Sequence, residues 1–530
     1  MNTSSRDANR APESKPASRH DARTRVPWFN PPVAQSGSRL AWYTAALAIC
    51  CGSLAAYYYA SLALTLSHYD AKAHLVVARR VFDSLTPGWK QVGAVWLPLP
   101  HLLNLLPVQL DVLYRTGLSG VVISVVSYAL TAAGLVALVA KTTRSTLGAV
   151  AAAAVFSADP NVLYLQSTPM TELLLFALLI GSVVVVMAWV EAEQSSETWR
   201  PGLVMSLACM TRYEAWPVTV ALLSLTVLVL IRRGQRWADS LRSVAAIAAW
   251  PFVAILLFLV NSRVSTARWF VTGGFFVPEN QAHGRPLVAV GQVVRGMIDT
   301  AGHLTVALGA AGLFFGALWY ARDRRRAHSV LSLALLATAA LPFYAFVSGH
   351  PFRVRYMVVL VLAMAAGCGY AVAAIPRWRW QVAAIVALLA TGPTPLDSNA
   401  PMVLEAQWDR PASRARQAVT ECLAGQFARP EDKVLASMGS LAHYMQELAV
   451  AGFRLDDFVH EGTDEVWSEA LSSPRRHVGW ILFEERAEGG DVLTHRRSQN
   501  PDFIEGFDRV CEGGGVALYR RSSRGDISLP

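Results

Sequence analysis

The chain contains few charged residues for its length. Only 16% of its 530 residues are Asp, Glu, Lys or Arg and 53% are hydrophobic, whereas soluble domains carry about 25% charged residues. The apolar residues also form long blocks, such as 40–66 and 356–375. Each block can cross a hydrocarbon core, which needs roughly 20 apolar residues. This composition excludes a soluble globular protein and predicts a polytopic membrane protein.

Motifs of nucleotide binding and metal binding are also missing. The sequence has no Walker loop and no dinucleotide-type glycine pattern, which argues against soluble nucleotide donors and ATP-driven transport. No Cys or His spacing of the metal-binding kind occurs. Of the six cysteines, four lie in apolar runs and act there as small apolar residues. The other two, Cys422 and Cys511, form a disulfide in an oxidising compartment or else remain two isolated buried thiols.

The basic charge is distributed unevenly along the chain. The net charge is +9, but residues 400–530 hold 15 Lys and Arg against 21 Asp and Glu, whereas residues 1–399 hold 32 against 17. Basic residues that flank membrane spans are expected on the cytoplasmic side, so this charge indicates topology first and an affinity for anions second. No compact basic domain lies outside the membrane, which argues against a nucleic-acid partner.

The apolar runs define the transmembrane domain, residues 40–395. Clear spans occur at 40–66, 116–140, 173–190, 215–231, 243–260, 301–320, 329–347 and 356–375. Shorter runs, which could also be re-entrant or interfacial, occur at 147–156, 202–211 and 380–392. The first span is too long and too bulky near its end for a signal peptide and is predicted to be a retained anchor. Counting every run gives eleven crossings.

The positive-inside rule orients these crossings. With the N-terminus inside, every basic cluster between helices lies on the cytoplasmic side, at 141–144, 232–236, 322–326 and 377–379. The first long loop, 67–110, and the tail then lie outside. Removing the runs at 147–156 and 202–211 together would preserve the parity of the crossings and keep these basic clusters inside, so the rule does not decide whether those two runs cross. With both runs crossing, Asp159, Glu172 and Glu214 all lie outside.

The two ends of the chain differ from the transmembrane domain. Residues 1–39 are polar and lack the apolar content of a core, which predicts a disordered cytoplasmic arm. Residues 396–530 mix helix-like stretches with short apolar runs that are typical of buried strands, at 412–427, 440–451, 433–436 and 477–483. The predicted fold class is an all-α polytopic membrane domain of about 11 transmembrane helices, followed by a small extracytoplasmic α/β domain.

The first outside loop carries a candidate catalytic pair. Asp70 and His74 are four residues apart, so a helix would place them on one face. A carboxylate just beyond a span can reach a lipid head group while it remains hydrated. The alternative is that Asp70 only caps the helix N-terminus, where a negative charge is favoured. Residues 96–101, rich in proline and apolar side chains, are suited to lying on the membrane.

Further polar residues gather on the same side of the membrane. Carboxylates occur at Asp159 and Glu172, and residues 212–214 are Arg212, Tyr213 and Glu214. Charged residues beside a span are costly unless they are paired or exposed to water, so they indicate a functional site by default. A structural ion pair of Arg212 with Glu172 or Glu214 is the alternative interpretation.

A late loop holds arginines on the side that positive-inside statistics disfavour. The segment that follows the span at 329–347 contains His350, Arg353 and Arg355. An arginine kept on this side usually has an anion to hold, and guanidinium binds phosphate in a bidentate manner. Snorkelling of these arginines to lipid phosphate is the alternative.

Together these features resemble the GT-C fold glycosyltransferases, the superfamily that includes protein O-mannosyltransferases and bacterial aminoarabinose transferases. The resemblance rests on Asp70 directly after the first span, a helical first outside loop, the late segment Arg353-Val354-Arg355-Tyr356, and a C-terminal domain outside the membrane. The chain departs from the common pattern at Ala71, where many members have a second acidic residue, and this argues against a metal site built from that loop.

The resemblance implies a function on the outer face of a bacterial cytoplasmic membrane. The donor would be a polyprenyl-phosphate sugar, the acceptor a hydroxyl of a protein, glycan or lipid, and transfer would invert the anomeric carbon. Asp70 would be the general base, with His74 to orient it or bind the acceptor, and the leaving phosphate would be neutralised by Arg212, Arg353 and Arg355. Sugar or acceptor contacts would come from Asp159, Glu172, Tyr213, Glu214 and His350. Coordination of a divalent cation by Asp159 and Glu172 is the less favoured alternative. The tail would help to recognise the acceptor.

Two other classes of protein also present charge outside the membrane. A transporter or flippase of lipid-linked sugars predicts polar residues deep within spans and broken helices, whereas the long apolar runs here are almost free of charge at their centres. A noncatalytic scaffold that presents the tail gives no reason for the outward arginines at 353 and 355.

Overall fold

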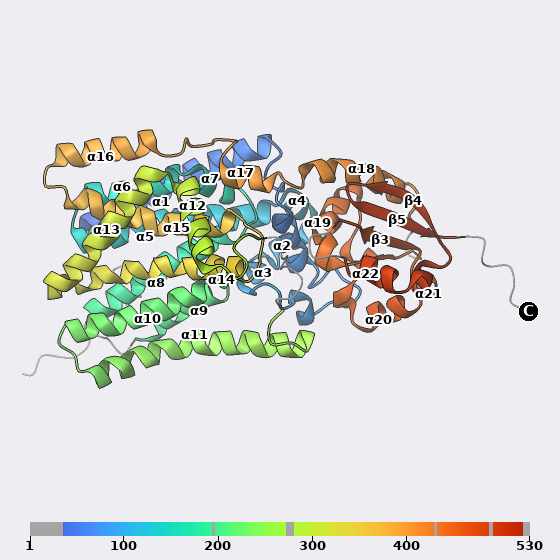
Figure 1. Cartoon of the computed structure of the whole chain (residues 1–530), viewed down its shortest axis with the longest axis horizontal. Helices are drawn as coiled ribbons and strands as arrows, with labels where there is room; N and C mark the ends of the chain where they lie inside the picture. Colours follow the sequence, from blue (N-terminus) through green and yellow to red (C-terminus); the bar gives the residue numbers. More distant parts are fainter. Residues whose placement is uncertain (1–34, 193–196, 272–279, 429–431, 487–490, 523–530) are drawn as a thin grey trace, which may run out of the picture.

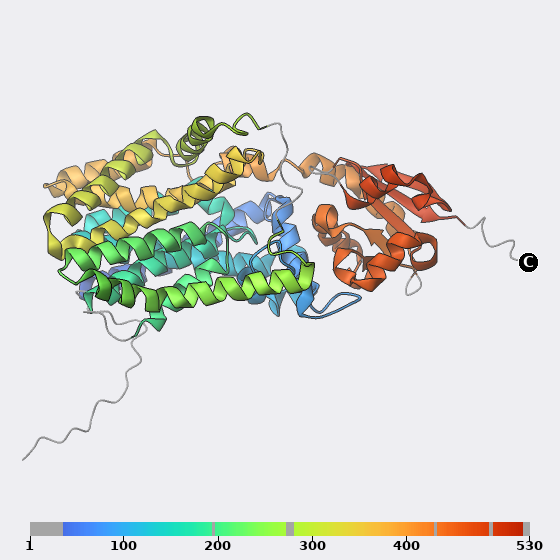
Figure 2. The same ribbon diagram turned by 60° about the horizontal axis from the view of Figure 1, so that its bottom comes forward.

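The computed structural model describes residues 35–192, 197–271, 280–428, 432–486 and 491–522. A helical domain and a smaller α/β domain follow one another along the long axis of the molecule (Figure 1). The turned view in Figure 2 shows the same end-to-end arrangement. The predicted arm lies outside the described residues up to residue 34, and residues 35–39 already belong to the first helix.

Every predicted apolar run forms a helix. The long segments are α1 Gln35–Ser61, α5 Leu118–Thr143, α8 Glu172–Glu191, α10 Ala215–Arg232, α11 Trp237–Thr266, α13 His303–Arg322, η3 Arg324–Ala339 with α14 Ala340–Val347, and α15 Arg355–Ala374. The shorter runs are α6 Thr146–Ala158, α9 Trp199–Cys209 and α16 Trp378–Thr391. Within the described ranges, eight helices are long and apolar enough to cross a membrane. The predicted all-α polytopic domain is confirmed.

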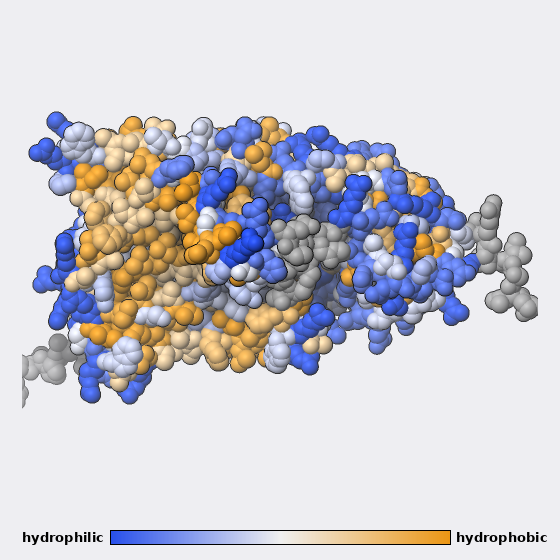
Figure 3. Space-filling view, in the orientation of Figure 1, coloured by the Kyte–Doolittle hydropathy of each residue, from blue (hydrophilic) through white to orange (hydrophobic). Residues whose placement is uncertain are grey.

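The surface of the helical domain carries the band that a bilayer requires. Apolar side chains form a broad belt over the helices, and hydrophilic residues flank it at the far end of the helical domain and over the α/β domain (Figure 3). Exposed large side chains of this belt include Leu47 on α1, Val126 on α5 and Phe252 on α11. Exposure of these side chains to hydrocarbon is lower in free energy than their exposure to water, so the belt marks the membrane-facing surface.

Helix α15 lies at the centre of the helical domain. In its most apolar stretch, 89% of the residues are buried, a larger share than in any other candidate span of the described residues. It packs closely on α13, where a Cβ added at Gly312 or at Gly367 would overlap backbone atoms of the facing helix. Small residues permit such close approach, which is a main source of helix association in membranes. This packing fixes the position of Arg355, the first residue of α15.

One predicted span has a different helical geometry. The run at 329–347 was expected to be a single α-helix, but residues Arg324–Ala339 form a 3-10 helix that becomes α-helical only at Ala340. Ser332 and Thr338 donate side-chain hydrogen bonds to the carbonyls three residues earlier, at 3.0 and 2.8 Å. Residues 327–332 are all buried, and toward the end of the helix the buried positions 332, 335 and 338 are three residues apart, the spacing of one face of a 3-10 helix.

Short elements connect the spans at the end of the helical domain that faces the α/β domain. They are α2 Tyr69–Arg79, η1 Trp89–Val92, α3 Leu99–Asn104, η2 Pro107–Gln109, α4 Asp111–Thr116, α7 Pro160–Leu165 and α12 Pro286–Ala301. Helix α2 is the helix that the spacing of Asp70 and His74 predicts.

The tail forms the predicted α/β domain. Its helices are α17 Pro401–Ala406, α18 Arg410–Ala424, α19 Met438–Leu448, α20 Glu465–Ser472, α21 Pro474–His477 and α22 Val492–Gln499, with the short turns η4 Ala449–Ala451, η5 Leu455–Asp457, η6 Glu461–Thr463 and η7 Pro501–Ile504. The strands are β1 Val434–Ala436, β2 Phe458–Val459, β3 Trp480–Glu484, β4 Phe507–Gly513 and β5 Val516–Arg521. They form one sheet of order β2-β1-β3-β5-β4, parallel from β2 to β3 and antiparallel from β3 to β4.

The tail is docked firmly on the segment 67–110, between the first and second long helices. Lys72 of α2 pairs with Glu447 of α19 at 2.5 Å, with side chains only 8% and 17% exposed. The apolar residues Ala73 and Val76 of α2 belong to the same buried cluster as Leu441 of α19. Helix α2 therefore contributes to the core of the tail domain. Helix α17, in contrast, packs on α7 of the helical domain through a hydrogen bond from the Met402 amide to Asn161, at 2.9 Å.

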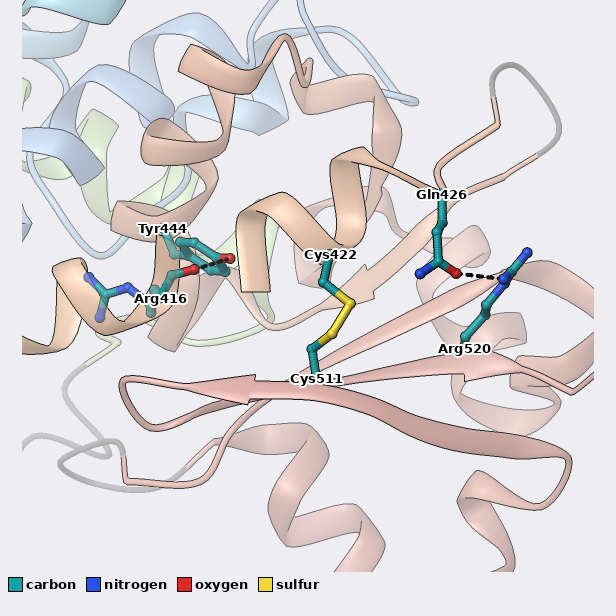
Figure 4. Close-up of a disulfide and its surroundings, with 6 residues drawn as sticks. All are labelled: Arg416, Cys422, Gln426, Tyr444, Cys511 and Arg520. Atoms are coloured by element: carbon teal, nitrogen blue, oxygen red, sulfur yellow. Dashed lines mark hydrogen bonds between the residues drawn. A yellow bond between two sulfur atoms is a disulfide. The ribbon is translucent and has the colours of Figure 1, made fainter. Parts of the chain in front are cut away.

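The two tail cysteines are joined. A disulfide links Cys422 of α18 to Cys511 of β4, across 89 residues of sequence (Figure 4). This outcome selects one of the two alternatives that the sequence leaves open. The four remaining cysteines are free thiols.

Removal of the disulfide should destabilise the tail domain. We expect the Cys422→Ser/Cys511→Ser double variant to lower the free energy of unfolding by about 2–5 kcal/mol, because the unfolded chain loses a constraint. Thermal unfolding of the purified protein measures this change, with Cys50→Ser, a free and exposed thiol, as the control. Alkylation of denatured, unreduced protein should label four of the six cysteines; labelling of all six would contradict the disulfide.

Candidate active site

The first turn of α2 presents Asp70. The side chain of His68 caps the helix, because its Nδ1 accepts a hydrogen bond from the Asp70 amide at 3.1 Å. The capping role that was the alternative for Asp70 is therefore filled by His68, and the Asp70 carboxylate is directed elsewhere. A negative charge in the first turn is also favoured by the helix dipole.

The Asp70 carboxylate forms an ion pair with Arg355 of α15, and a guanidinium Nη1 donates to Oδ2. The two side chains are 9% and 12% exposed. Burial alone would raise the pKa of Asp70, but the charge of Arg355, with smaller effects of His68 and His74, holds that pKa well below its ordinary range. Asp70 is thus ionised at any physiological pH.

Arg355 is positioned by a carboxylate that the sequence did not reveal. Glu405 of α17 accepts hydrogen bonds from the backbone amides of Val354 and Arg355, at 2.5 and 3.4 Å. A carboxylate at these amides stabilises the N-terminus of α15. Burial raises the pKa of Glu405, and the nearby arginines partly offset the effect. Glu405 lies beyond the predicted domain boundary at 396, and no sequence pattern marks it as part of this site.

Three aromatic and imidazole rings lie beside the pair. His74 is hydrogen-bonded through Nδ1 to Nε2 of His101 at 3.1 Å, and the Trp96 ring lies 4.2 Å from the His74 ring. Burial lowers the pKa of His74 to about 3, with further lowering by Arg212 and Arg355 against the opposite effect of Asp70. Both histidines are therefore neutral at pH 7. Trp96 and His101 were expected only to lie on the membrane.

Arg212 occupies the centre of a second charge cluster. Its guanidinium donates to Glu214 at 2.7 Å, to Glu172 at 2.8 Å and to the Thr171 hydroxyl at 3.1 Å. Both carboxylates are almost completely buried. Burial alone would lower the pKa of Arg212, but the two carboxylates raise it. The structural ion pair, which the sequence left as an alternative, is thus formed with both partners. Tyr213 donates its hydroxyl hydrogen to the carbonyl of Val95 at 3.1 Å.

The two clusters meet at His74. Its pKa responds to Asp70, Arg212 and Arg355, so these charges lie within electrostatic range of one imidazole. The structure thereby brings together residues from α2, α8, α15 and the segment before α10.

Three other predicted residues are placed differently. Asp159 caps α7, accepting from the amides of Asn161 and Val162 at 2.9 and 3.0 Å, and burial raises its pKa to about 7. It lines a small hollow of about 20 Å³ with residues of α13 and α16, away from Asp70. His350 contacts Tyr356, with Nε2 3.4 Å from the phenol oxygen. The guanidinium of Arg353 lies 4.8 Å from the centre of the Trp408 ring.

Metal binding would need several ligands at one point. Among the described residues, no group of three or more His, Cys, Asp and Glu side chains is arranged to hold a metal ion. Asp159 and Glu172, the carboxylates considered for a cation, serve a helix cap and an ion pair respectively.

The fold and these charges define a polytopic membrane protein with its charged site beneath a docked α/β domain. A scan against models of known protein families finds no match, and a search of curated proteins finds no relative. Among solved structures, ArnT from Cupriavidus metallidurans in the apo state is similar over 87% of this chain and 97% of its own, with a TM-score of 0.51 and 13% identity.

Two archaeal structures show weaker similarity. The Archaeoglobus fulgidus oligosaccharyltransferase in the apo form covers 92% of this chain and 75% of its own, with a TM-score of 0.48 and 13% identity. AglB from the same organism, in complex with an inhibitory peptide and a dolichol-phosphate, covers 94% and 76%, with a TM-score of 0.46 and 12% identity. The similarity to ArnT shows that this chain has a GT-C fold and is an integral membrane protein, as the sequence resemblance predicts.

Arg212 should be essential for stability. We expect Arg212→Leu to cost about 3–5 kcal/mol, because two buried carboxylates lose their counter-charge. Thermal unfolding in detergent measures the loss. Arg295→Gln, which removes an 83% exposed guanidinium, is the control and should leave the midpoint unchanged. Adding Glu172→Gln and Glu214→Gln to Arg212→Leu should restore much of the stability; an unchanged midpoint in Arg212→Leu alone would contradict the ion-pair cluster.

Proposed function

We propose that the chain is an integral-membrane glycosyltransferase that moves a sugar from a polyprenyl-phosphate donor to a hydroxyl acceptor, with inversion of the anomeric carbon. The observation that carries the proposal is the direct contact of a carboxylate, Asp70, with a guanidinium, Arg355, at the outer end of a GT-C fold. Inverting transfer needs both groups: a base for the acceptor hydroxyl and a cation for the leaving phosphate.

The proposed reaction moves one proton and exchanges one bond at the anomeric carbon. The acceptor O–H bond breaks and its proton passes to Asp70. The acceptor oxygen bonds to the anomeric carbon while the bond from that carbon to the phosphate oxygen breaks. The electron pair of the broken bond stays on the polyprenyl phosphate, whose growing charge is neutralised by Arg355 and Arg353.

The ion pair also suggests how the base becomes active. While Arg355 contacts Asp70, the depressed pKa makes the carboxylate a weak base. Among the described residues, the buried Nε of Arg355 has no hydrogen-bond partner and can donate to a phosphate oxygen. We infer that the donor phosphate shares or replaces Asp70 at Arg355, so that donor binding raises the basicity of Asp70 where the acceptor needs it.

The remaining residues have supporting roles in the proposal. Arg212 holds Glu172 and Glu214 by ion pairs, and Glu172 Oε2, which has no partner among the described residues, can accept a hydrogen bond from a sugar hydroxyl. In the proposal, His74, Tyr213 and His350 contact the sugar or the acceptor. The acceptor class is a protein, glycan or lipid, and the docked tail contributes to its recognition.

The proposed location is the bacterial cytoplasmic membrane, with the N-terminus inside and the tail outside. Support comes from the tail disulfide, since disulfides persist in oxidising compartments. The alternative class, a transporter or flippase, expects charge at mid-span. In the eight described spans, charged side chains lie near the helix ends, and the change from η3 to α14 at Ala340 carries no charge.

Loss of the carboxylate charge should abolish transfer. We expect Asp70→Asn to reduce turnover at least about a hundredfold, the typical contribution of a general base, in an assay with the purified protein, synthetic polyprenyl-phosphate sugars and envelope acceptors. Asp111→Asn, an exposed carboxylate directly after the same loop, at the start of α4, is the control and should retain activity. Full activity of Asp70→Asn with normal membrane insertion would remove the assigned base.

The pH dependence should differ between the free and the donor-bound enzyme. In the free enzyme the pKa of Asp70 is far below its ordinary range and the pKa of His74 is about 3, so neither group should produce an acid limb of kcat/KM near neutral pH. If the donor phosphate engages Arg355, the pKa of Asp70 rises, and the acid limb of kcat should lie at higher pH than that of kcat/KM. Coincident limbs would contradict donor-dependent activation of the base.

A further inference from the structure

A large hollow lies at the opposite end of the helical domain from Asp70. Helix α8 begins at Glu172, in the candidate active site, and ends at Glu191 beside this hollow. Twenty helical residues separate the two ends by about 30 Å. The hollow has a volume of about 850 Å³ and lies among the C-terminal ends of α5, α8 and α10 and the start of η3. Hydrophilic surface covers this end of the molecule (Figure 3).

The lining of the hollow is strongly basic. Its basic side chains are Lys141, Arg144, Arg233 and the three consecutive arginines at 324–326, and its carboxylates are Glu191 and Asp323. Within the described part of the chain, six positive charges thus face two negative charges. The three helix C-termini add roughly half a negative charge each, which does not balance the excess. Topology explains why basic residues occur at this end, but not why they converge on one hollow.

The existing ion pairs leave part of this charge available. Glu191 pairs with Lys141 at 2.6 Å, and Nδ1 of His328 lies 3.6 Å from a Glu191 oxygen, beyond hydrogen-bond distance. Arg233 donates through Nη1 to the Val190 carbonyl at 3.0 Å and lies 3.4 Å from Nδ1 of His328 through Nη2. Among the described residues, Arg233 Nε and His328 Nε2 are buried without a hydrogen-bond partner. His328 is 6% exposed and lines the hollow. Its buried Nε2 atom is therefore available to a ligand in the hollow.

Arg144 occupies a backbone position that favours glycine. It follows the last turn of α5 with a φ of 59°, in the left-handed region. A glycine or asparagine commonly fills such a position, whereas a bulky residue there costs conformational energy. The arginine is nevertheless present, exposed at the rim of the hollow.

We propose that this hollow binds a phosphate-bearing anion, and that its source is the phosphodiester head group of an anionic membrane phospholipid. The excess of arginines matches phosphate, which guanidinium binds in a bidentate manner. Basic hollows between transmembrane helices at the cytoplasmic membrane surface are suited to lipid head groups. The volume admits a phosphodiester with its glycerol, and the apolar belt that borders this end (Figure 3) accommodates acyl chains.

Native mass spectrometry of the purified full chain tests the site, with cardiolipin, phosphatidylglycerol and phosphatidylcholine as probes. We expect both anionic lipids to be retained over phosphatidylcholine. One lost charge should weaken binding about fivefold, since each surface Lys or Arg contributes about 1 kcal/mol toward anionic lipid. Arg144→Gly should show this loss, and Arg144→Gly/Arg325→Gln a loss of about 25-fold.

The variants separate binding from folding. Arg144→Gly removes a charge and also relieves the left-handed backbone, so its thermal unfolding midpoint should be unchanged or higher. The matched control is Arg242→Gln, an 83% exposed arginine near the start of α11 that does not line the hollow; its lipid binding should stay within about twofold of the wild type.

Competition identifies the source of the anion. Displacement of cardiolipin by millimolar inorganic phosphate or pyrophosphate, with the same dependence on Arg144, would assign the site to a free phosphate compound and keep the anion site. Equal retention of phosphatidylcholine, or equal loss in Arg242→Gln, would overturn the proposal. Sugar transfer depends on Asp70 at the far end of α8, so failure of lipid binding and failure of the proposed transfer are distinguishable.

Discussion

A buried ion pair joins helix α2, which follows the first long helix, to the central helix α15. Asp70 and Arg355 are both shielded from water, and a charge in such a place is tolerated only with a partner. The pair therefore fixes the position of α2 relative to the N-terminus of α15. The cap from His68, the hydrogen bonds to Glu405 and the docking of the tail on α2 all serve to maintain it.

The tail domain is part of this arrangement and not an appendage. Helix α2 presents Asp70 toward α15 and Lys72 toward Glu447 of α19. Arg416 of α18 also binds Glu447, at 3.1 Å, so the network continues into the tail. A change in the seating of the tail would be transmitted to the first turn of α2 through packed side chains. A domain in this position can couple its own contacts to the charged site.

The two ends of the helical domain treat charge differently. At the end that faces the α/β domain, Arg355 faces Asp70 and Arg212 faces two carboxylates, so the charges are largely compensated within the protein. At the opposite end, basic side chains outnumber carboxylates around one hollow within the described part of the chain.

The sequence by itself determined the helical segments of the membrane domain, the fold class and two strands of the tail, β1 and β3, because transfer of apolar residues from water is a local property that adds up along a run. It did not reveal the tail strands β2, β4 and β5. It missed the 3-10 geometry at 324–339, which depends on side-chain hydrogen bonds and close packing. It named Asp70 and Arg355 but could not pair them, and it missed Glu405 and His101. Only the tertiary structure decided these contacts, since partners 285 residues apart meet through the packing of whole helices, and the energy of a charge pair depends on the distance that this packing sets.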